Sequence, residues 1–158
     1  MRAYADTSFL VKLLTQEPGT TTTVADYRRL GRPSVFFLPL HSLEVTNAIR
    51  QRAFHQRHTK PSSDRSAIKR ERDTSLALLH KYLSRRAFIE ISHDMDTAIE
   101  LARSLSAKHT ERLGCRGFDL LHVALALELE CEFFLTSDQV QGALARAEGL
   151  DVTISADE

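Results

Sequence analysis

Four carboxylates stand where the sequence predicts strand ends or the first turns of helices. Asp6 ends an apolar run near the N-terminus, and Asp138 follows the apolar run EFFLT by two residues. Glu44 lies in the opening turns of one predicted helix, and Asp119 begins another. In open α/β sheets the ligand crevice lies beyond the carboxyl ends of the strands. We therefore expect these four side chains to meet at one edge of a sheet.

Crowded carboxylates indicate a cation. They repel one another unless a positive charge lies between them, and hard divalent ions such as Mg²⁺ and Mn²⁺ prefer oxygen ligands. A bound divalent ion lowers the pKa of a water molecule and offsets the negative charge that develops as the water attacks a phosphodiester. These residues therefore predict metal-dependent hydrolysis of phosphodiester bonds.

Each of these acids taken singly also has a purely structural explanation. Asp119 and Asp138 could cap the helices that they precede, because Asp is a preferred N-cap residue. Asp6 could be an ordinary turn residue, and Glu44 a solvated helix residue. Four such accounts would all have to coincide at the same edge of the sheet, so the joint placement favours the metal site.

Three polar residues near the acids have two interpretations each. Asn47 lies one turn after Glu44, either in the same pocket or as an exposed amide. His122 follows Asp119 by three residues, which suggests a general base, but its apolar flanks favour a buried, hydrogen-bonded histidine. Arg116 precedes Asp119 by three residues and could contact a scissile phosphate or lie on the surface.

Short β-rich runs alternate with helical patterns along the chain, which predicts an α/β fold with a parallel sheet flanked by helices on both faces. We expect the strands over residues 3–6, 34–38, 87–91, 132–136 and 152–154. We expect helices over residues 8–17, 22–30, 40–57, 66–84, 94–107, 119–130 and 139–148, with an irregular segment over 110–117.

Length and composition predict one domain over residues 1–158. The chain is 42% hydrophobic and 27% charged, which supplies a core and excludes global disorder. Two cysteines cannot form a secreted disulfide scaffold. No stretch approaches the roughly 20 apolar residues of a membrane span, and Asp6 and Lys12 interrupt any signal peptide. We expect a cytoplasmic protein with no membrane contact.

The net charge is zero but its distribution is uneven. Residues 50–86 hold 11 Lys and Arg against 3 acids, whereas residues 87–158 hold 5 against 14. The basic segment is either a solvated helical hairpin or a path for RNA phosphates. A negative catalytic pocket requires positive charge nearby to attract RNA, which favours the second interpretation.

Four motifs in this order resemble those of PIN-domain nucleases, and within them the VapC-type toxins of bacterial and archaeal toxin–antitoxin pairs. The motifs are YADTSFLVKLL, HSLEVTNAI, FDLLHVALA and LTSDQV. The resemblance covers nearly the whole chain. It implies a Rossmann-like sheet, a Mg²⁺- or Mn²⁺-dependent endoribonuclease, homodimerisation and inhibition by a small antitoxin. It also implies catalytic and metal-binding roles for Asp6, Glu44, Asp119 and Asp138, with Asp6 and Asp119 as direct ligands.

The resemblance also matches Ser8 and Thr136 to small hydroxyl positions, where a hydroxyl orients a carboxylate or a water. The chain departs from shorter family members in the length and basicity of its segment from Arg50 to Arg86. Two alternatives stay open: a PIN-type RNA-processing nuclease without an antitoxin, and a non-catalytic partner-binding domain with a structural cation. A nucleotide-binding module is disfavoured because no glycine-rich loop follows the first predicted strand.

Overall fold

A five-stranded parallel sheet forms the centre of the molecule, with the strand order β3-β2-β1-β4-β5. The computed structural model describes residues 2–155. The strands are β1 (Ala3–Ala5), β2 (Val35–Phe37), β3 (Phe88–Glu90), β4 (Phe133–Thr136) and β5 (Asp151–Ile154). The order reverses between β1 and β4, so the crevice of this fold class is expected beyond the carboxyl ends of these two strands.

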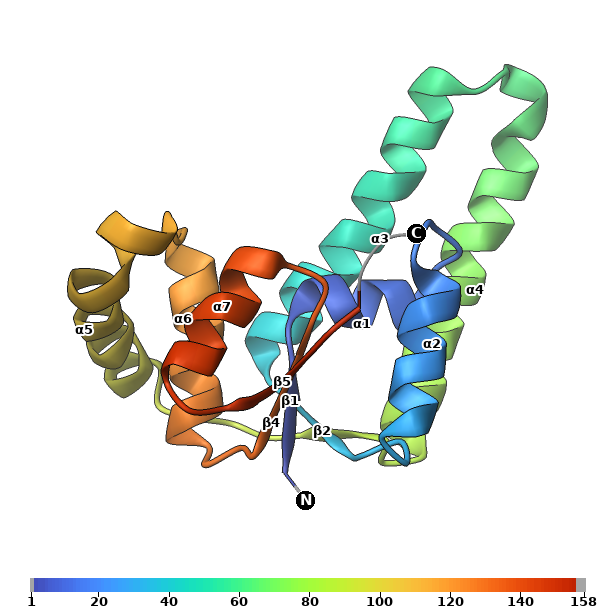
Figure 1. Cartoon of the computed structure of the whole chain (residues 1–158). Helices are drawn as coiled ribbons and strands as arrows, with labels where there is room; N and C mark the ends of the chain where they lie inside the picture. Colours follow the sequence, from blue (N-terminus) through green and yellow to red (C-terminus); the bar gives the residue numbers. More distant parts are fainter. Residues whose placement is uncertain (1, 156–158) are drawn as a thin grey trace.

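Helices cover both faces of the sheet (Figure 1). They are α1 (Thr7–Leu14), α2 (Thr20–Arg29), α3 (Pro39–Thr59), α4 (Arg65–Ser84), α5 (Met95–Leu113), α6 (Gly117–Glu128) and α7 (Gln139–Ala147), with a short 3₁₀ helix at Ser62–Asp64. One apolar core packs under α1 to α4 and the other under α5 to α7. The predicted α/β architecture is confirmed.

Strand β1 contributes to both cores because its side chains alternate between the faces. Ala3 and Ala5 lie in the core under α1 to α4, whereas Tyr4 lies in the core under α5 to α7. All three are fully buried. The small alanines let α1 pack closely on the sheet, and the tyrosine carries a hydroxyl into the opposite core.

Two predicted boundaries were wrong in a way that affects the site. Helix α5 continues to Leu113 and ends at Gly114, whose φ of 71° is the left-handed conformation that terminates helices. The irregular segment expected over 110–117 is therefore reduced to three residues. Helix α6 begins at Gly117, so Asp119 is its third residue and not its first. The carboxylate of Asp119 accepts a hydrogen bond from the backbone N–H of Arg116, and this contact starts the helix earlier.

The basic segment forms most of the antiparallel pair α3 and α4, which projects beyond the rest of the molecule (Figure 1). Part of its charge is used within the fold. Arg52 bonds to Glu17 and Glu71 at 3.2 and 3.1 Å and thereby ties α3 to α4 and to the turn before α2. The predicted helical hairpin is therefore present. Within residues 2–155, no helix has the length and apolar character needed to cross a membrane.

The buried side chain of His41 makes the stability of the fold depend on pH. Burial, with a smaller contribution from His122, lowers the pKa of His41 from about 6.5 to about 3. The folded protein therefore binds fewer protons than the unfolded chain between these values, and the free energy of unfolding falls as pH falls below 6.5. From pH 7 to pH 5 this group alone should cost about 2 kcal/mol.

The variant His41→Asn isolates that contribution. Asn cannot be protonated, yet its carbonyl oxygen can accept the backbone N–H of Leu38, which bonds Nδ1 of His41 at 3.0 Å. Urea unfolding at pH 7 and pH 5 should show a smaller loss of stability in the variant than in the parent. Equal losses in the two proteins would contradict the assignment to His41.

Candidate active site

The four predicted carboxylates line one pocket of about 290 Å³ at the carboxyl edge of the sheet. Asp6 follows β1 and Asp138 follows β4, the two strands at which the sheet order reverses. Glu44 comes from α3 and Asp119 from α6. The remaining lining residues are Thr7, Ser8, Arg116, Gly117, Phe118, His122 and Gln141. Tertiary structure thus brings together acids that are up to 132 positions apart.

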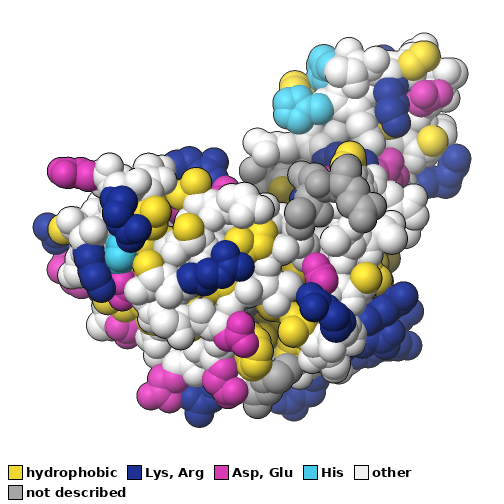
Figure 2. Space-filling model, in the orientation of Figure 1, with side chains coloured by type: hydrophobic (Ala, Val, Ile, Leu, Met, Phe, Trp, Pro, Cys, Tyr) yellow, Lys and Arg dark blue, Asp and Glu magenta, His cyan; other side chains and the backbone are white. Residues whose placement is uncertain are grey.

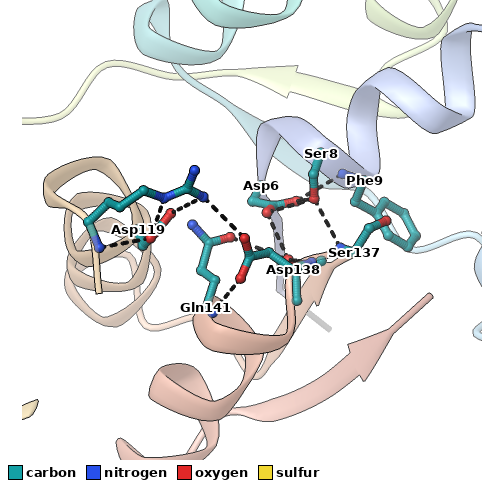
Figure 3. A network of polar contacts seen from close by, with 9 residues as sticks. Asp6, Ser8, Phe9, Asp119, Ser137, Asp138 and Gln141 are labelled. Carbon is teal, nitrogen blue, oxygen red and sulfur yellow. Dashed lines mark hydrogen bonds and ion pairs between the residues drawn. The ribbon is translucent and has the colours of Figure 1, made fainter. Parts of the chain in front are cut away.

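Asp6 is the most enclosed of these acids and is held by four hydrogen bonds (Figure 3). It is the N-cap of α1, and the backbone N–H of Phe9 donates to Oδ1 at 2.9 Å. The hydroxyl of Ser8 lies 2.8 Å from both carboxylate oxygens, and that of Thr136 donates to Oδ2 at 2.7 Å. Burial raises the pKa of Asp6, while these donors act in the opposite direction. A nearby positive charge would therefore favour its ionised form.

Arg116 bridges two of the acids. Its guanidinium donates to both oxygens of Asp119, at 3.1 and 3.2 Å, and to Oδ2 of Asp138 at 3.1 Å. Asp138 is also the N-cap of α7, where Oδ1 accepts the backbone N–H of Gln141 at 2.9 Å. Asp138 is therefore both the predicted cap and a pocket acid, whereas Asp119 lies in the first turn of α6 and is not its N-cap. Arg116 supplies the positive charge that separates Asp119 from Asp138.

Glu44 also lines the pocket and has two partners of its own. Thr7 donates to Oε2 at 2.8 Å, and Nε2 of His122 lies 2.9 Å from the same oxygen. Burial alone would raise the pKa of Glu44, but the contacts with His122 and Thr7 lower it below its usual value. Glu44 is therefore ionised at neutral pH.

Two of the three predicted supporting residues touch the acids. Ser8 and Thr136 both donate to Asp6, and each also accepts a backbone N–H from the loop after β4, at Ser137 and Asp138. The hydroxyls thereby connect the ends of β1 and β4. The structure does not bring Asn47 to the pocket: its side chain is exposed on α3 and lies outside the lining. A step of three residues rotates it by about 60° from Glu44 and moves it about 4.5 Å further along the helix.

Three polar residues near the site were not singled out from the sequence. Thr7 binds Glu44, Gln141 lines the pocket, and Tyr4 binds His122. Gln141 follows Asp138 by three residues, a spacing typical of a capping pair, so this signal was present in the sequence. Nothing in the local sequence marks Tyr4, because its contact crosses 118 positions. His122 is buried and hydrogen-bonded, as its apolar flanks suggest.

The donor set suits a hard divalent cation in type and in placement. Carboxylate oxygens are the ligands that Mg²⁺ and Mn²⁺ prefer, and four such groups surround one pocket. Within the part of the chain that the structure describes, no three His, Cys, Asp or Glu side chains converge closely enough to hold an ion. In this arrangement the guanidinium of Arg116 binds the carboxylates of Asp119 and Asp138. These residues fit a cation once Arg116 releases them.

Basic side chains from two separate segments line a second pocket at the C-terminal end of α4. Arg28 and Arg32, at and after the end of α2, line a second pocket of about 320 Å³ together with Lys81 and Arg85. No ion pair within residues 2–155 involves these four side chains. Dark-blue side chains gather beside α2 in Figure 2. The basic character of the chain is thus distributed along the whole hairpin and extends onto α2.

The model of the PIN domain family matches residues 3–157. The chain belongs to the PIN domain family. PIN domains are generally metal-dependent nucleases, which agrees with the acidic pocket. No curated protein sequence matches this one.

Solved structures share the PIN fold. The structure of PAE2754 from Pyrobaculum aerophilum has a TM-score of 0.55 and 16% identity over 96% of this chain and 89% of that chain. The structure of VapBC2 from Rickettsia felis, bound to a DNA fragment from its promoter, has a TM-score of 0.60 and 12% identity over the full length of both chains. At these identities the likeness concerns the fold.

Proposed function

We propose that this PIN domain is a Mg²⁺- or Mn²⁺-dependent endoribonuclease that hydrolyses phosphodiester bonds in RNA. The observation that carries the proposal is the meeting of Asp6, Glu44, Asp119 and Asp138 in one pocket where the sheet order reverses. Capping a helix requires one carboxylate and does not require four of them in a shared pocket. Four carboxylates together suit a divalent cation.

In this proposal the four acids bind the cation, and neighbouring hydroxyl groups position the acids. Asp6 and Asp119 hold the cation, and Glu44 and Asp138 complete its surroundings. Ser8 and Thr136 keep Asp6 oriented through the hydrogen bonds described above. When bound, the cation would lower the pKa of the attacking water and neutralise charge that develops on the phosphodiester.

In this proposal Arg116 also binds a phosphate group of the substrate. Its side chain is 75% exposed, so it can turn away from Asp119 and Asp138 without disturbing the core. A guanidinium released at the mouth of the pocket can bind a phosphate group of the substrate with two parallel hydrogen bonds. The cations along α4 and α2 extend this positive surface and would hold the RNA strand on either side of the scissile bond.

We infer further that the protein is the toxin of a toxin–antitoxin pair, acts as a homodimer in the cytoplasm, and is inhibited by a small antitoxin. The fold likeness to VapBC2 supports this role. An RNA-processing nuclease with no antitoxin has the same pocket, and co-purification with a small protein encoded beside it separates the two roles. A non-catalytic domain with a structural cation predicts cation binding without turnover.

Cleavage of total RNA by the purified protein tests the proposal. We expect cutting with Mg²⁺ or Mn²⁺ and no cutting with EDTA, because the acidic pocket alone repels the substrate and cannot activate water. Restoring the ion to EDTA-treated protein should restore the activity. A folded, partner-free protein that cuts no RNA with either ion, or that cuts equally well in EDTA, would overturn the proposal.

A further inference from the structure

A chain of three hydrogen-bonded side chains leads from the core to the acidic pocket. The hydroxyl of Tyr4, in the middle of β1, lies 2.8 Å from Nδ1 of His122 on α6. Nε2 of His122 lies 2.9 Å from Oε2 of Glu44. Tyr4 and His122 are both buried, so solvent does not compete for these contacts. The proton positions in this series of three hydrogen-bonded side chains therefore follow from their donors and acceptors.

A single tautomer of His122 satisfies every group in the chain. An ionised Glu44 can only accept, so Nε2 of His122 must carry a proton and donate it. The Tyr4 hydroxyl has no other hydrogen-bond acceptor among the described residues, so its proton must go to Nδ1. A proton on Nδ1 would make the Tyr4 oxygen an acceptor and leave its own O–H without a partner in a buried site. Glu44 and Tyr4 together therefore select the neutral imidazole with its proton on Nε2.

With this tautomer His122 donates to one oxygen of Glu44, which leaves the other oxygen to face a ligand. Oε2 accepts hydrogen bonds from both Thr7 and His122. Within residues 2–155, no donor lies on Oε1. Anchoring one oxygen from two directions fixes the plane of the carboxylate and leaves the lone pairs of the other oxygen for the pocket.

We propose that Tyr4 and His122 are positioning residues that hold Glu44 with Oε2 anchored and present Oε1 to a divalent cation as a single ligand oxygen. The assignment rests on the proposed function, because it takes Glu44 as part of the cation's surroundings. It goes beyond that function by giving His122 a role other than acid–base chemistry and by extending the site to a core residue of β1.

Aromatic packing keeps the two rings in place. The ring of His41 stacks on that of His122, with centroids 5.4 Å apart and planes 27° apart. The ring of Tyr4 stacks on that of Phe134, with centroids 5.7 Å apart and planes 7° apart. Rings packed in this way cannot rotate freely, and a ligand held by such rings keeps its geometry.

Tyr4→Phe tests the proposal, because it removes the hydroxyl and keeps the ring. Two quantities are measured: the His122 tautomer, from ¹⁵N–¹H correlation spectra of the imidazole at pH 7, and the affinity for Mn²⁺, from the EPR signal of the free ion. We expect the parent protein to carry its proton on Nε2. We expect the variant to keep the proton on Nε2, because Glu44 still accepts it. We expect it to bind Mn²⁺ roughly tenfold more weakly, because the hydroxyl that held the Nδ1 side of the His122 ring is then missing.

Tyr27→Phe is the matched control. Tyr27 is also a buried tyrosine whose hydroxyl donates a hydrogen bond, to the backbone oxygen of Pro33 at 2.9 Å, but it lies away from the pocket. A purely structural effect of losing a buried hydroxyl should appear in both variants as a lower melting temperature. The Mn²⁺ affinity should change in Tyr4→Phe alone.

The outcomes separate this proposal from the proposed function. A parent protein with its proton on Nδ1, or a Tyr4→Phe variant with unchanged Mn²⁺ affinity, would overturn the positioning role. The tautomer is measured on the unmodified protein without RNA or metal, so it decides the proton arrangement even if no RNA is cleaved. Absence of Mn²⁺ binding by the parent protein would overturn the cation role of Glu44 and the proposed function together.

Discussion

Asp119→Asn should lower the rate of RNA cleavage by about 10³-fold at saturating Mg²⁺. The expected loss corresponds to about 4 kcal/mol of transition-state stabilisation, which is the size of effect that a catalytic metal supplies. Asn keeps the shape of the side chain and one oxygen that can accept the backbone N–H of Arg116, so the start of α6 should persist. Initial rates on a labelled RNA, with circular dichroism as a check of folding, measure the effect.

Asp96→Asn is the control for this substitution. Asp96 lies in the first turn of α5, as Asp119 lies in the first turn of α6, but it is exposed and distant from the pocket lining. Both substitutions remove one negative charge near a helix N-terminus, so they share any effect on the helix dipole. Asp96→Asn should cleave RNA at the parent rate. Retention of parent activity by a folded Asp119→Asn would refute the assigned role of Asp119.

Arg116→Ala should strengthen Mn²⁺ binding by about tenfold. In the structure a cation that binds both Asp119 and Asp138 competes with the guanidinium that bonds to both. Removing charge-assisted hydrogen bonds from the metal-free state removes a competitor, and about 1.4 kcal/mol corresponds to a factor of ten. Calorimetric titration of the parent and the variant with Mn²⁺ measures the change.

Arg103→Ala provides the comparison for Arg116→Ala. Arg103 pairs with Glu100 across three positions of α5, with an exposed fraction of 74% close to the 75% of Arg116. The loss of one exposed arginine changes the total charge equally in both variants, while the pocket acids are freed in Arg116→Ala alone. Unchanged or weaker Mn²⁺ binding by Arg116→Ala would show that the guanidinium does not compete with the ion.

Asp6 and Asp138 act both as helix caps and as pocket residues, which explains why the sequence allowed two interpretations of each. Asp6 and Asp138 are N-caps whose carboxylates bond backbone N–H groups, and both also line the pocket. A helix that starts at the carboxyl edge of a parallel sheet points its free N–H groups into the crevice. An acid placed there therefore caps the helix and faces a ligand, so the structural and functional interpretations do not compete.

The sequence by itself determined the element order, the parallel sheet and the edge at which the four acids meet. These features follow from local signals: apolar runs, helical periodicity, and acids at fixed distances from strand ends. Parallel connections between such elements leave few arrangements of the chain. The positions of Asp6, Glu44, Asp119 and Asp138 in one pocket could thus be predicted without coordinates.

Only the tertiary structure decided which groups touch those acids. The direction of each side chain depends on small rotations of packed helices, and a shift of three residues along α3 separates Glu44 in the pocket from Asn47 in solvent. The contact of Tyr4 with His122 and the bridge from Arg116 to Asp138 join segments 118 and 22 positions apart. Such contacts carry no local sequence signal, because they exist only when both partners are held by the same core.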